Sequence, residues 1–236
     1  MRTYTTKDLS EYLANDWILS LLCENEAEWE KDIRTHQWLL EMDNKRMICS
    51  DVYGDLLREK SSLKVLDVGG GYSSLTKVLA QHTNYTLLDF MAHGGVLNSY
   101  LKEYGINWLN MDWYDCEEPG DYDIIIANDI FPDVDQRLEL FIDKMLPHCS
   151  ELRLVVTYYN HPRFYTTRRI DDTELLTFLS WDGEITGLKL RKYISRSNLT
   201  EVEIEEMKYL TDSIYWNMRQ VSYLVIKGDL SSYTRE

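Results

Sequence analysis

The stretch KVLDVGGGYSSLTKVLA, residues 64–80, combines an acid, three consecutive glycines and the start of an amphipathic helix pattern. A strand that ends in a glycine turn and leads into a helix presents backbone N–H groups at the carboxyl edge of a sheet. Glycine suits such a turn because a Cβ would occupy the space of a ligand that lies on the backbone. The stretch therefore predicts a ligand site, although tight packing alone remains an alternative.

Asp67 and the glycine spacing distinguish among three ligands that such turns bind: a nucleotide phosphate, a dinucleotide and S-adenosylmethionine. No Gly-Lys-Ser or Gly-Lys-Thr follows, which excludes the Walker pattern. The dinucleotide pattern G-x-G-x-x-G fits Gly69 and Gly71, but its third glycine would fall at Ser74. A carboxylate two residues before the first glycine would repel a pyrophosphate and attract the ammonium and sulfonium of S-adenosylmethionine. The turn therefore favours the cationic ligand.

The elements that must position this turn follow from the hydrophobic pattern. Residues 7–58 are expected to be helical, because large apolar residues recur every third or fourth position. From residue 63 onward, short apolar runs alternate with helical patterns, which indicates a parallel sheet with helices on both faces. Strands are expected at 63–68, 84–89, 106–112, 121–129 and 151–160, and helices at 73–82, 96–105 and 134–146. Beyond residue 160 we expect a helix near 171–179, a strand near 185–194, a helix near 200–210 and a strand near 219–227.

The run VLDVGGGYS is similar to the glycine-rich first motif, D/E-x-G-x-G-x-G, of the class I S-adenosylmethionine-dependent methyltransferases, and departs from it at Ser73. The resemblance covers roughly residues 63–160. It implies an α/β fold with a doubly wound, seven-stranded, mostly parallel sheet, the Rossmann-like methyltransferase fold. We expect the segments near 185–194 and 219–227 to complete this sheet as an antiparallel pair.

The resemblance implies S-adenosylmethionine as cofactor and gives roles to residues that follow successive strands. Asp89 would bind both ribose hydroxyls, and Phe90 would pack on the adenine. Asp112 and Trp113 would meet the adenine edge, and Asn128 would lie near the donor methyl group. Asp89 as a solvated loop acid and Asp112 as a helix N-cap remain alternatives. The expected cofactor-binding residues are Asp67, Gly69, Gly70, Gly71, Asp89, Phe90, Asp112, Trp113 and Asn128.

Methyl transfer needs a base only when the nucleophile is a hydroxyl or a protonated amine. His161 and Asp129, at the ends of two expected strands, are the candidate catalytic residues, and histidine is the side chain that most readily accepts a proton near neutral pH. The sequence NDIFP replaces the Asn/Asp-Pro-Pro-aromatic box of amine-methylating relatives, which favours a hydroxyl acceptor, for example in a sugar or natural-product intermediate. The alternatives are an N-methyltransferase, a non-catalytic scaffold of this fold and a nicotinamide oxidoreductase. No role is assigned to His36, His82, His93 and His148.

The stretch YYNHPRFYTTRR, residues 158–169, gathers aromatic rings and three arginines directly after an expected strand. An arginine there is expected to bind a carboxylate or phosphate of the acceptor, while the rings cover its apolar face. A salt bridge in a dimer and a solvated loop are the alternatives. The expected substrate residues are Tyr158, Tyr159, Arg163 and Arg168, with Arg169 as a further candidate.

Composition limits the partners and the compartment. The 25 basic and 40 acidic residues give a net charge of −15, which argues against a nucleic-acid partner because an acidic surface repels phosphates. The four cysteines lack metal-ligand spacing, so no metal is expected. No apolar leader or membrane-length run is seen, so we expect a cytoplasmic protein that acts on a small molecule, with a homodimer left open. Residues 1–60 are expected to form an N-terminal helical cap and residues 61–236 the methyltransferase domain.

Overall fold

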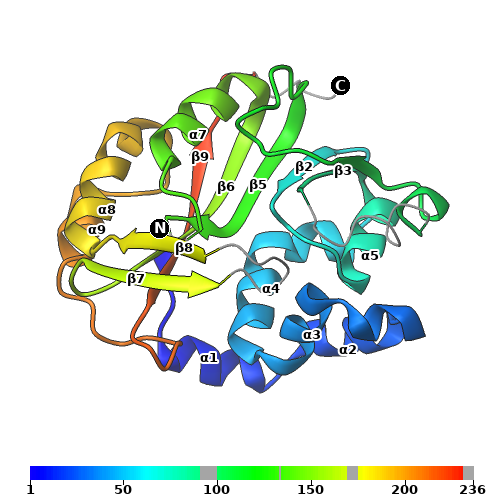
Figure 1. Cartoon of the computed structure of the whole chain (residues 1–236), viewed down its shortest axis with the longest axis horizontal. Coiled ribbons are helices and arrows are strands. Elements are labelled where there is room, and N and C mark those ends of the chain that lie inside the picture. Colours follow the sequence, from blue (N-terminus) through cyan, green and yellow to red (C-terminus); the bar gives the residue numbers. More distant parts are fainter. Residues whose placement is uncertain (91–99, 133, 169–174, 231–236) are drawn as a thin grey trace.

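The computed structural model describes residues 1–90, 100–132, 134–168 and 175–230, without the side chains of residues 167, 168 and 176. Seven strands form one sheet in the order β1-β9-β6-β5-β2-β3-β4, and β7 and β8 form a separate hairpin. The sheet strands are β1 (Arg2–Thr3), β2 (Lys64–Val68), β3 (Asn84–Leu88), β4 (Asn107–Leu109), β5 (Tyr122–Phe131), β6 (Cys149–Tyr158) and β9 (Gln220–Lys227). The expected α/β fold with a seven-stranded, mostly parallel sheet is therefore confirmed (Figure 1).

The strand order reverses at the centre of the sheet. From β2 the chain continues through β3 to β4 on one side, and β5 and β6 lie on the other side, all paired in parallel. In an open α/β sheet, ligands bind beyond the carboxyl ends of the strands at such a reversal. The glycine turn follows β2 and therefore lies at this point.

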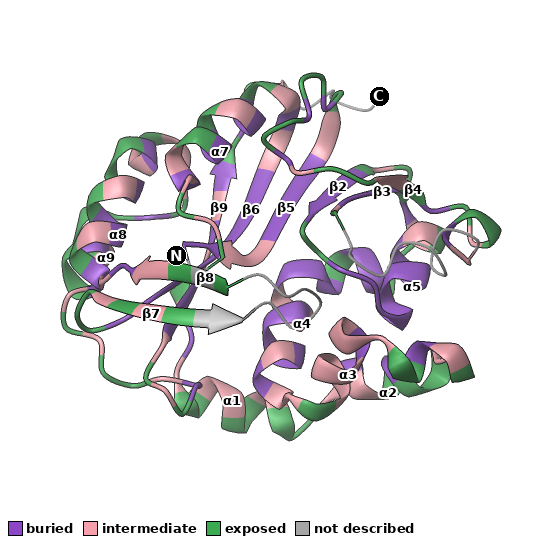
Figure 2. Cartoon of the chain, in the orientation of Figure 1, coloured by how far each residue is buried: buried purple, intermediate pink, exposed green. Residues whose placement is uncertain are grey.

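Helices cover both faces of the sheet (Figure 1). One face carries α1 to α5, which pack on one apolar cluster, and the other carries α7 to α9, which pack on a second cluster. Figure 2 shows the strands between them as buried along most of their length. The helices are α1 (Thr6–Leu13), α2 (Trp17–Asn25), α3 (Arg34–Glu41), α4 (Asp43–Arg58), α5 (Ser74–His82), α7 (Leu138–Met145), α8 (Gly183–Leu190) and α9 (Glu201–Glu206), with short 3-10 turns at Glu28–Asp32, Leu146–His148 and Arg191–Arg196.

Strand β5 shows why the expected strands read as continuous apolar runs. Ile124 and Ile126 pack toward α4, and Ile125 and Ala127 pack toward α7. A strand covered on both faces needs apolar residues at every position, unlike a strand with one face in water. The same sandwiching explains the runs in β2 and β6, and it confirms the strands expected between residues 63 and 160.

The strand expected near residues 185–194 is wrong, because this segment forms α8 and the 3-10 turn after it. Within α8 the buried residues are Gly183, Thr186, Gly187 and Leu190, a helical spacing. A Cβ on Gly183 would lie 2.0 Å from the main-chain oxygen of Met207, so the glycine permits close packing of α8 at the end of α9. The antiparallel partner of β9 at the sheet edge is instead β1 from the N-terminus.

The helix expected near residues 171–179 is also wrong where it can be compared, because Leu175–Ser180 is strand β8. It pairs antiparallel with β7 (Arg163–Arg168). Tyr165 opposes Phe178 across this hairpin with ring centroids 5.6 Å apart, and such cross-strand aromatic pairs stabilise a two-stranded sheet. The remaining residues of the expected helix, 171–174, lie outside the described residues.

The helical N-terminus, α9 near 200–210 and β9 near 219–227 agree with expectation. Of the helix expected at 96–105, only residues 100–103 lie in a described helix. Within the described ranges, no helix has both the length and the apolar character needed to cross a membrane.

Candidate functional site

The turn after β2 has a backbone conformation that glycine adopts readily. Gly69 and Gly71 have φ angles of +65° and +64°, in the left-handed region. A Cβ on Gly71 would lie 2.5 Å from Cγ2 of Thr35, and one on Gly70 would lie 2.3 Å from Oδ2 of Asp67. The three glycines therefore form a tight turn between the Asp67 carboxylate and α3, with no room for side chains.

A carboxylate from the neighbouring strand lies on this turn. Asp89 follows β3, and the Gly71 N–H donates to Asp89 Oδ2 at 2.9 Å. The indole N–H of Trp108 donates to the main-chain oxygen of Asp89 at 2.7 Å, which holds the residue in place. Phe90, the next residue, is 43% exposed. The acid expected to bind ribose is therefore positioned at the glycine turn.

Asp67 lies buried on the other side of the turn. The Tyr85 hydroxyl donates to Oδ2 at 2.7 Å, and the Tyr53 hydroxyl donates to Oδ1 at 3.1 Å. Burial raises the pKa of Asp67 to about 6, although the two hydroxyl donors act in the opposite direction. A cation placed beside this carboxyl would favour its ionised form.

The amides of Ser73, the N-cap of α5, and of Ser74, its first residue, are bonded by side chains of the protein. The Ser74 N–H donates to Nδ1 of His36 at 3.4 Å, and the Ser73 N–H donates to Oγ1 of Thr76 at 3.0 Å. In the tautomer that this requires, His36 Nε2–H donates to Glu26 at 2.8 Å. Phosphate-binding turns direct such amides at the ligand. Here side chains occupy them, which disfavours a pyrophosphate at this helix end.

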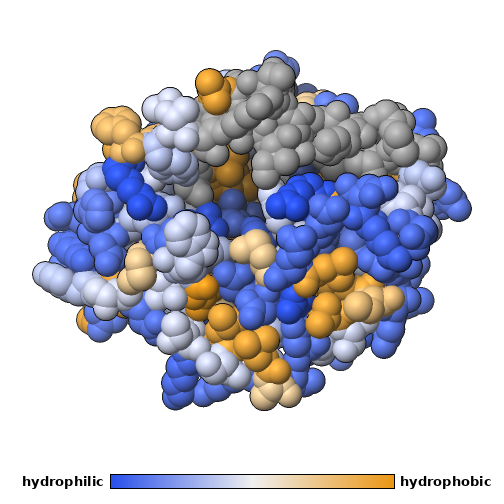
Figure 3. Space-filling model, turned by 60° about the horizontal axis from the view of Figure 1, so that its bottom comes forward, coloured by the Kyte–Doolittle hydropathy of each residue, from blue (hydrophilic) through white to orange (hydrophobic). Residues whose placement is uncertain are grey.

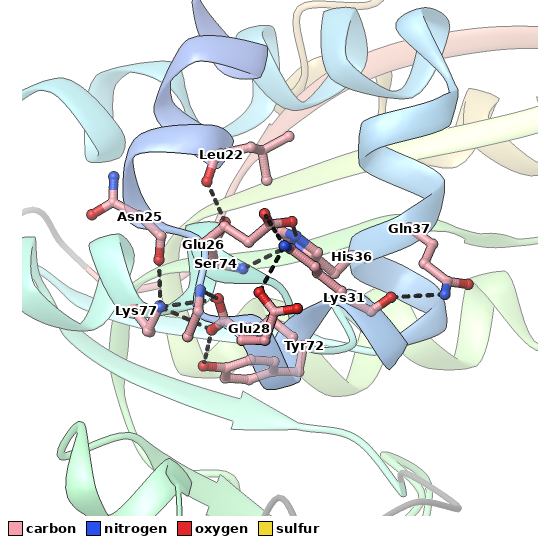
Figure 4. Close-up of polar contacts among 12 residues, drawn as sticks. Leu22, Asn25, Glu26, Glu28, Lys31, His36, Gln37, Tyr72, Ser74 and Lys77 are labelled. Atoms are coloured by element: carbon pink, nitrogen blue, oxygen red, sulfur yellow. Dashed lines mark hydrogen bonds and ion pairs between the residues drawn. The ribbon is translucent and has the colours of Figure 1, made fainter.

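A buried ion pair fixes the N-terminal helices to α5 (Figure 4). Glu30 has no exposed surface and lies 2.9 Å from the Lys77 ammonium. It also accepts hydrogen bonds from the Tyr72 hydroxyl at 2.8 Å and from the Ala27 N–H at 2.7 Å. Lys77 donates in addition to the main-chain oxygen of Asn25. These bonds place Tyr72, the residue after the glycines, in a fixed position.

Comparison with known proteins adds to this geometry. No protein-family model and no curated protein matches the sequence. The structure matches 501 chains of solved structures. One is the DhpI–SAH complex (SAH, S-adenosylhomocysteine), with a TM-score of 0.52 and 12% identity over 93% of this chain and 96% of that one. The chain has the class I methyltransferase fold.

Two further solved structures are similar at lower scores. Coclaurine N-methyltransferase, bound to N-methylheliamine and SAH, has a TM-score of 0.48 and 16% identity over 92% of this chain and 88% of that one. The 1,6-didemethyltoxoflavin-N1-methyltransferase of Burkholderia thailandensis was solved with bound 1,6-didemethyltoxoflavin and S-adenosylhomocysteine. It has a TM-score of 0.49 and 13% identity over 97% of this chain and 93% of that one.

The residues at the turn of this methyltransferase fold suit S-adenosylmethionine chemically. The cofactor carries an ammonium, a sulfonium and two ribose hydroxyls, all of which pair with carboxylates. Asp67 and Asp89 supply carboxylates on the two sides of the glycine turn. A pyrophosphate would instead meet two acids and amides that are already bonded, so the donor set fits the cationic cofactor better.

Asp112 and Trp113 occupy different surroundings from the turn. Asp112 forms an ion pair with Arg137 at 3.2 Å. The Trp113 ring is buried on the α7 side of the sheet, where it packs edge-on against Phe141 with centroids 5.2 Å apart. Its indole N–H donates to Asp135 at 2.8 Å. The indole is thus part of the core, and contact with an adenine stays a prediction.

Asn128 and Asp129 lie where β5 is interrupted by a register shift against β6. Asp129 has a φ of +61°, and its carboxylate turns toward Lys45 of α4, 2.9 Å away, and Arg219 before β9, 3.4 Å away. Burial would raise the pKa of Asp129, but the two cations outweigh burial and lower it. Asp129 is therefore ionised and a weak base.

The residues expected to bind the acceptor are only partly brought together. Tyr158 is buried on the α7 side, with its hydroxyl 3.1 Å from Oγ of Ser222. The Arg163 guanidinium stacks over the Tyr159 ring, 3.7 Å from its centroid. His161 is exposed between β6 and β7. The side chain of Arg168 and the whole of Arg169 lie outside the described residues.

Sequence reasoning missed several residues of the site. Lys45, Tyr53, Tyr85 and Arg219 all contact its expected acids, yet none belongs to a local motif. The one local signal was the density of tyrosines in a chain with 17 of them. In the part of the chain that the structure describes, no group of three His, Cys, Asp or Glu side chains could hold a metal ion.

Proposed function

We propose that this protein is an S-adenosylmethionine-dependent methyltransferase that acts on a hydroxyl of a small-molecule acceptor. The observation that carries the proposal is the Asp89 carboxylate on the Gly71 amide, opposite the buried Asp67, at the point where the strand order reverses. Two carboxylates on one glycine turn suit a cation with hydroxyl donors, and they repel a phosphate.

The residues of the turn bind and orient the cofactor. Asp89 accepts hydrogen bonds from the ribose hydroxyls, Phe90 covers the adenine, and Asp67 pairs with the ammonium. The glycines let the backbone approach closely. The cofactor, when bound, supplies an electrophilic methyl group on a sulfonium. The protein contributes position and the exclusion of water, which are the main requirements of a direct displacement.

The carboxyl ends of β5 and β6 orient the acceptor in this proposal. Asp129 accepts a hydrogen bond from the acceptor hydroxyl, and its lowered pKa makes it a positioning group more than a proton acceptor. His161, exposed after β6, is the candidate base that receives the hydroxyl proton.

Calorimetry with a panel of ligands tests the cofactor. The panel contains S-adenosylmethionine, S-adenosylhomocysteine, NAD⁺ and ATP, each titrated into the full chain. We expect the two adenosyl compounds alone to bind, because only they lack a phosphate. Binding of NAD⁺ or ATP in place of S-adenosylhomocysteine would contradict the proposal.

Mass spectrometry tests the transfer itself. The full chain is incubated with methyl-labelled S-adenosylmethionine and pooled small metabolites, and labelled products are fragmented. A labelled methoxy group supports the proposal, whereas a labelled N-methyl group would replace the hydroxyl by an amine. Cofactor binding without any labelled product would favour a non-catalytic member of the fold.

A further inference from the structure

The amino-acid end of S-adenosylmethionine carries two opposite charges, and the residues proposed for the turn account for only one of them. Asp67 suits the ammonium, but the carboxylate beside that ammonium would lie near two acids of the turn, Asp67 and Asp89. Like charges repel, and the chain as a whole has a net charge of −15. A cofactor held at this turn therefore needs a cation for its carboxylate.

Helix α3 packs on the glycine turn. A Cβ on Gly71 would lie 2.5 Å from Cγ2 of Thr35, and the Thr35 hydroxyl donates to the main-chain oxygen of Tyr72. The residue before Thr35 is Arg34, the first residue of α3. Figure 3 brings the N-terminal helices forward and shows a largely hydrophilic surface on that side, so a charged ligand group does not have to enter apolar surroundings there.

The side of α3 that carries Arg34 extends from the glycine turn toward the end of β5. Arg34 and Trp38 lie one helical turn apart, and the guanidinium carbon lies over the Trp38 ring, 5.3 Å from its centroid. The Lys45 ammonium is 5.5 Å from the same centroid and 2.9 Å from Asp129, near the end of β5. Because β2 and β5 are neighbouring strands, this side of α3 borders the point where the strand order reverses.

One edge of the Arg34 guanidinium has no acceptor among the described residues. Both polar contacts of this side chain use Nη1, which donates to Oε1 of Gln37 at 3.2 Å and lies 3.9 Å from Oε2 of Glu41. Nε is buried and has no hydrogen-bond partner in the described part of the chain. Buried donors are nearly always bonded, so this one indicates a ligand. Nε and Nη2 form the planar edge through which an arginine can bind a carboxylate with two parallel hydrogen bonds.

Other basic side chains of the neighbouring helices are already engaged. Lys45, Arg46 and Lys77 each form an ion pair at 2.7 to 2.9 Å with a carboxylate that is at most 16% exposed. The carboxylate of Glu41, 3.9 Å from Arg34, is 61% exposed, and such a pair contributes little. Among these four cations, Arg34 is therefore the one best placed to bind a carboxylate of a ligand.

We propose that Arg34 binds the carboxylate of the methionine moiety of S-adenosylmethionine through its Nε–H and Nη2–H groups. Asp67 and Arg34 then hold the ammonium and the carboxylate of one amino-acid end, which fixes the position of the sulfonium relative to the turn. The N-terminal helices are in this way part of the cofactor site and not only a cover on the sheet. The assignment rests on the proposed function, because it names a further residue for the same cofactor.

Calorimetry on the full chain with two ligands tests the assignment. S-adenosylhomocysteine has the ammonium and the carboxylate, whereas S-adenosyl-3-thiopropylamine keeps the ammonium, ribose and adenine but lacks the carboxylate. Wild type should bind S-adenosylhomocysteine more tightly by about 10- to 150-fold, the range for a charged hydrogen bond. Arg34→Met should lose this preference, because its affinity for S-adenosylhomocysteine falls by the same factor while its affinity for the analogue is not reduced.

Three further variants make the test specific. Arg58→Met removes an arginine that also stacks over a tryptophan, 4.4 Å from the ring centroid of Trp17, and should leave both affinities unchanged. Arg34→Lys keeps the charge but not the planar edge, so its preference should lie between those of wild type and Arg34→Met. Asp67→Asn should weaken both ligands, because both carry the ammonium. Circular dichroism and thermal unfolding show whether each variant is folded.

The outcomes separate this inference from the proposed function. A preference for the carboxylate that disappears in folded Arg34→Met supports the assignment. An unchanged preference in folded Arg34→Met overturns it, and so does an equal loss of affinity for both ligands, because that loss would be structural. Equal affinities of wild type for the two ligands overturn it even if no Arg34 variant folds. If wild type binds neither ligand, the proposed function fails together with this assignment.

Discussion

Asp89 makes one contact at the glycine turn and is proposed to make a second, and one substitution removes both. Its Oδ2 accepts from the Gly71 N–H, and the proposed ribose contact would use the same carboxylate. Asp89→Ala removes both, and we expect S-adenosylhomocysteine affinity to fall by about 10- to 150-fold, since charged hydrogen bonds contribute about 1.5–3 kcal/mol. Calorimetry measures the change, with Asp115→Ala, an exposed acid, as control. Unchanged affinity in folded Asp89→Ala would remove Asp89 from the site.

The buried carboxyl of Asp67 lowers the stability of the folded chain at neutral pH and is proposed to contribute to cofactor binding. Its pKa is raised to about 6 by burial, against an ordinary value of 3.8. The folded state therefore binds the extra proton, and stability is lost as pH rises from about 4 to about 6, by about 3 kcal/mol in total. Asp67→Asn stays neutral, so it should be more stable than wild type at pH 7 by up to this amount in urea unfolding. It should also bind S-adenosylhomocysteine poorly.

The raised pKa of Asp67 also predicts that cofactor binding depends on pH. An ionised carboxylate is needed to pair with the cofactor ammonium, so affinity for S-adenosylhomocysteine should be constant above about pH 6 and fall below it. Calorimetry between pH 5 and pH 8 measures the profile. The decline should persist in His161→Ala, which removes the candidate base, and should vanish in Asp67→Asn. A decline that persists in Asp67→Asn would assign the titration to another group.

At the scale of residues, the sequence predicted the acids and glycines that surround one turn, because a local motif contains them. It did not predict that Lys45, Asp129 and Arg219 meet, because these positions are separated by more than eighty residues and only the fold joins them. It gave Trp113 a role at the adenine because of its neighbour in sequence; the structure shows the ring in the core on the α7 side, and the adenine contact stays a prediction.

At the scale of elements, the buried pair between Glu30 and Lys77 connects the N-terminal helices to the start of α5. Removing one partner of such a pair leaves an uncompensated buried charge, at a cost of about 3–5 kcal/mol. Lys77→Met should therefore be strongly destabilising in urea unfolding, and Glu30→Gln with Lys77→Met together should lose much less. The exposed Lys7→Met serves as control and should change stability by under about 1 kcal/mol. Equal losses in the single and double variants would show that the charge is not the cause.

Elements between residues 63 and 160 were predictable because strands covered on both faces give apolar runs that stand out from the amphipathic helices. The segment that forms α8 was not, because this helix is short and its pattern depends on packing. Its inner positions include two glycines, Gly183 and Gly187, chosen for contact with α9 and not for hydrophobicity. A pattern search for apolar residues therefore cannot detect this helix face.

At the scale of the whole molecule, the N-terminal helices and the sheet are joined at several distant points. The Arg153 guanidinium of β6 forms an ion pair with Asp55 of α4 at 2.7 Å, Tyr53 of α4 donates to Asp67 of β2, and β1 pairs with β9. One apolar cluster also spans α2, α4, α5 and the sheet. The region of residues 1–60 thus shares its apolar core with the sheet, so we do not expect it to fold separately.

We therefore expect the whole chain to unfold in one cooperative transition. Far-ultraviolet circular dichroism follows both regions, and three of the seven tryptophans, Trp17, Trp29 and Trp38, lie within residues 1–60. Urea curves from circular dichroism and from tryptophan fluorescence should coincide, as two-state unfolding requires. Arg153→Leu should shift both curves equally, because it leaves Asp55 unpaired at the contact between the regions and destabilises the single unit. Two curves that do not coincide, and that separate further in Arg153→Leu, would instead show that the N-terminal helices and the rest of the chain unfold in separate steps.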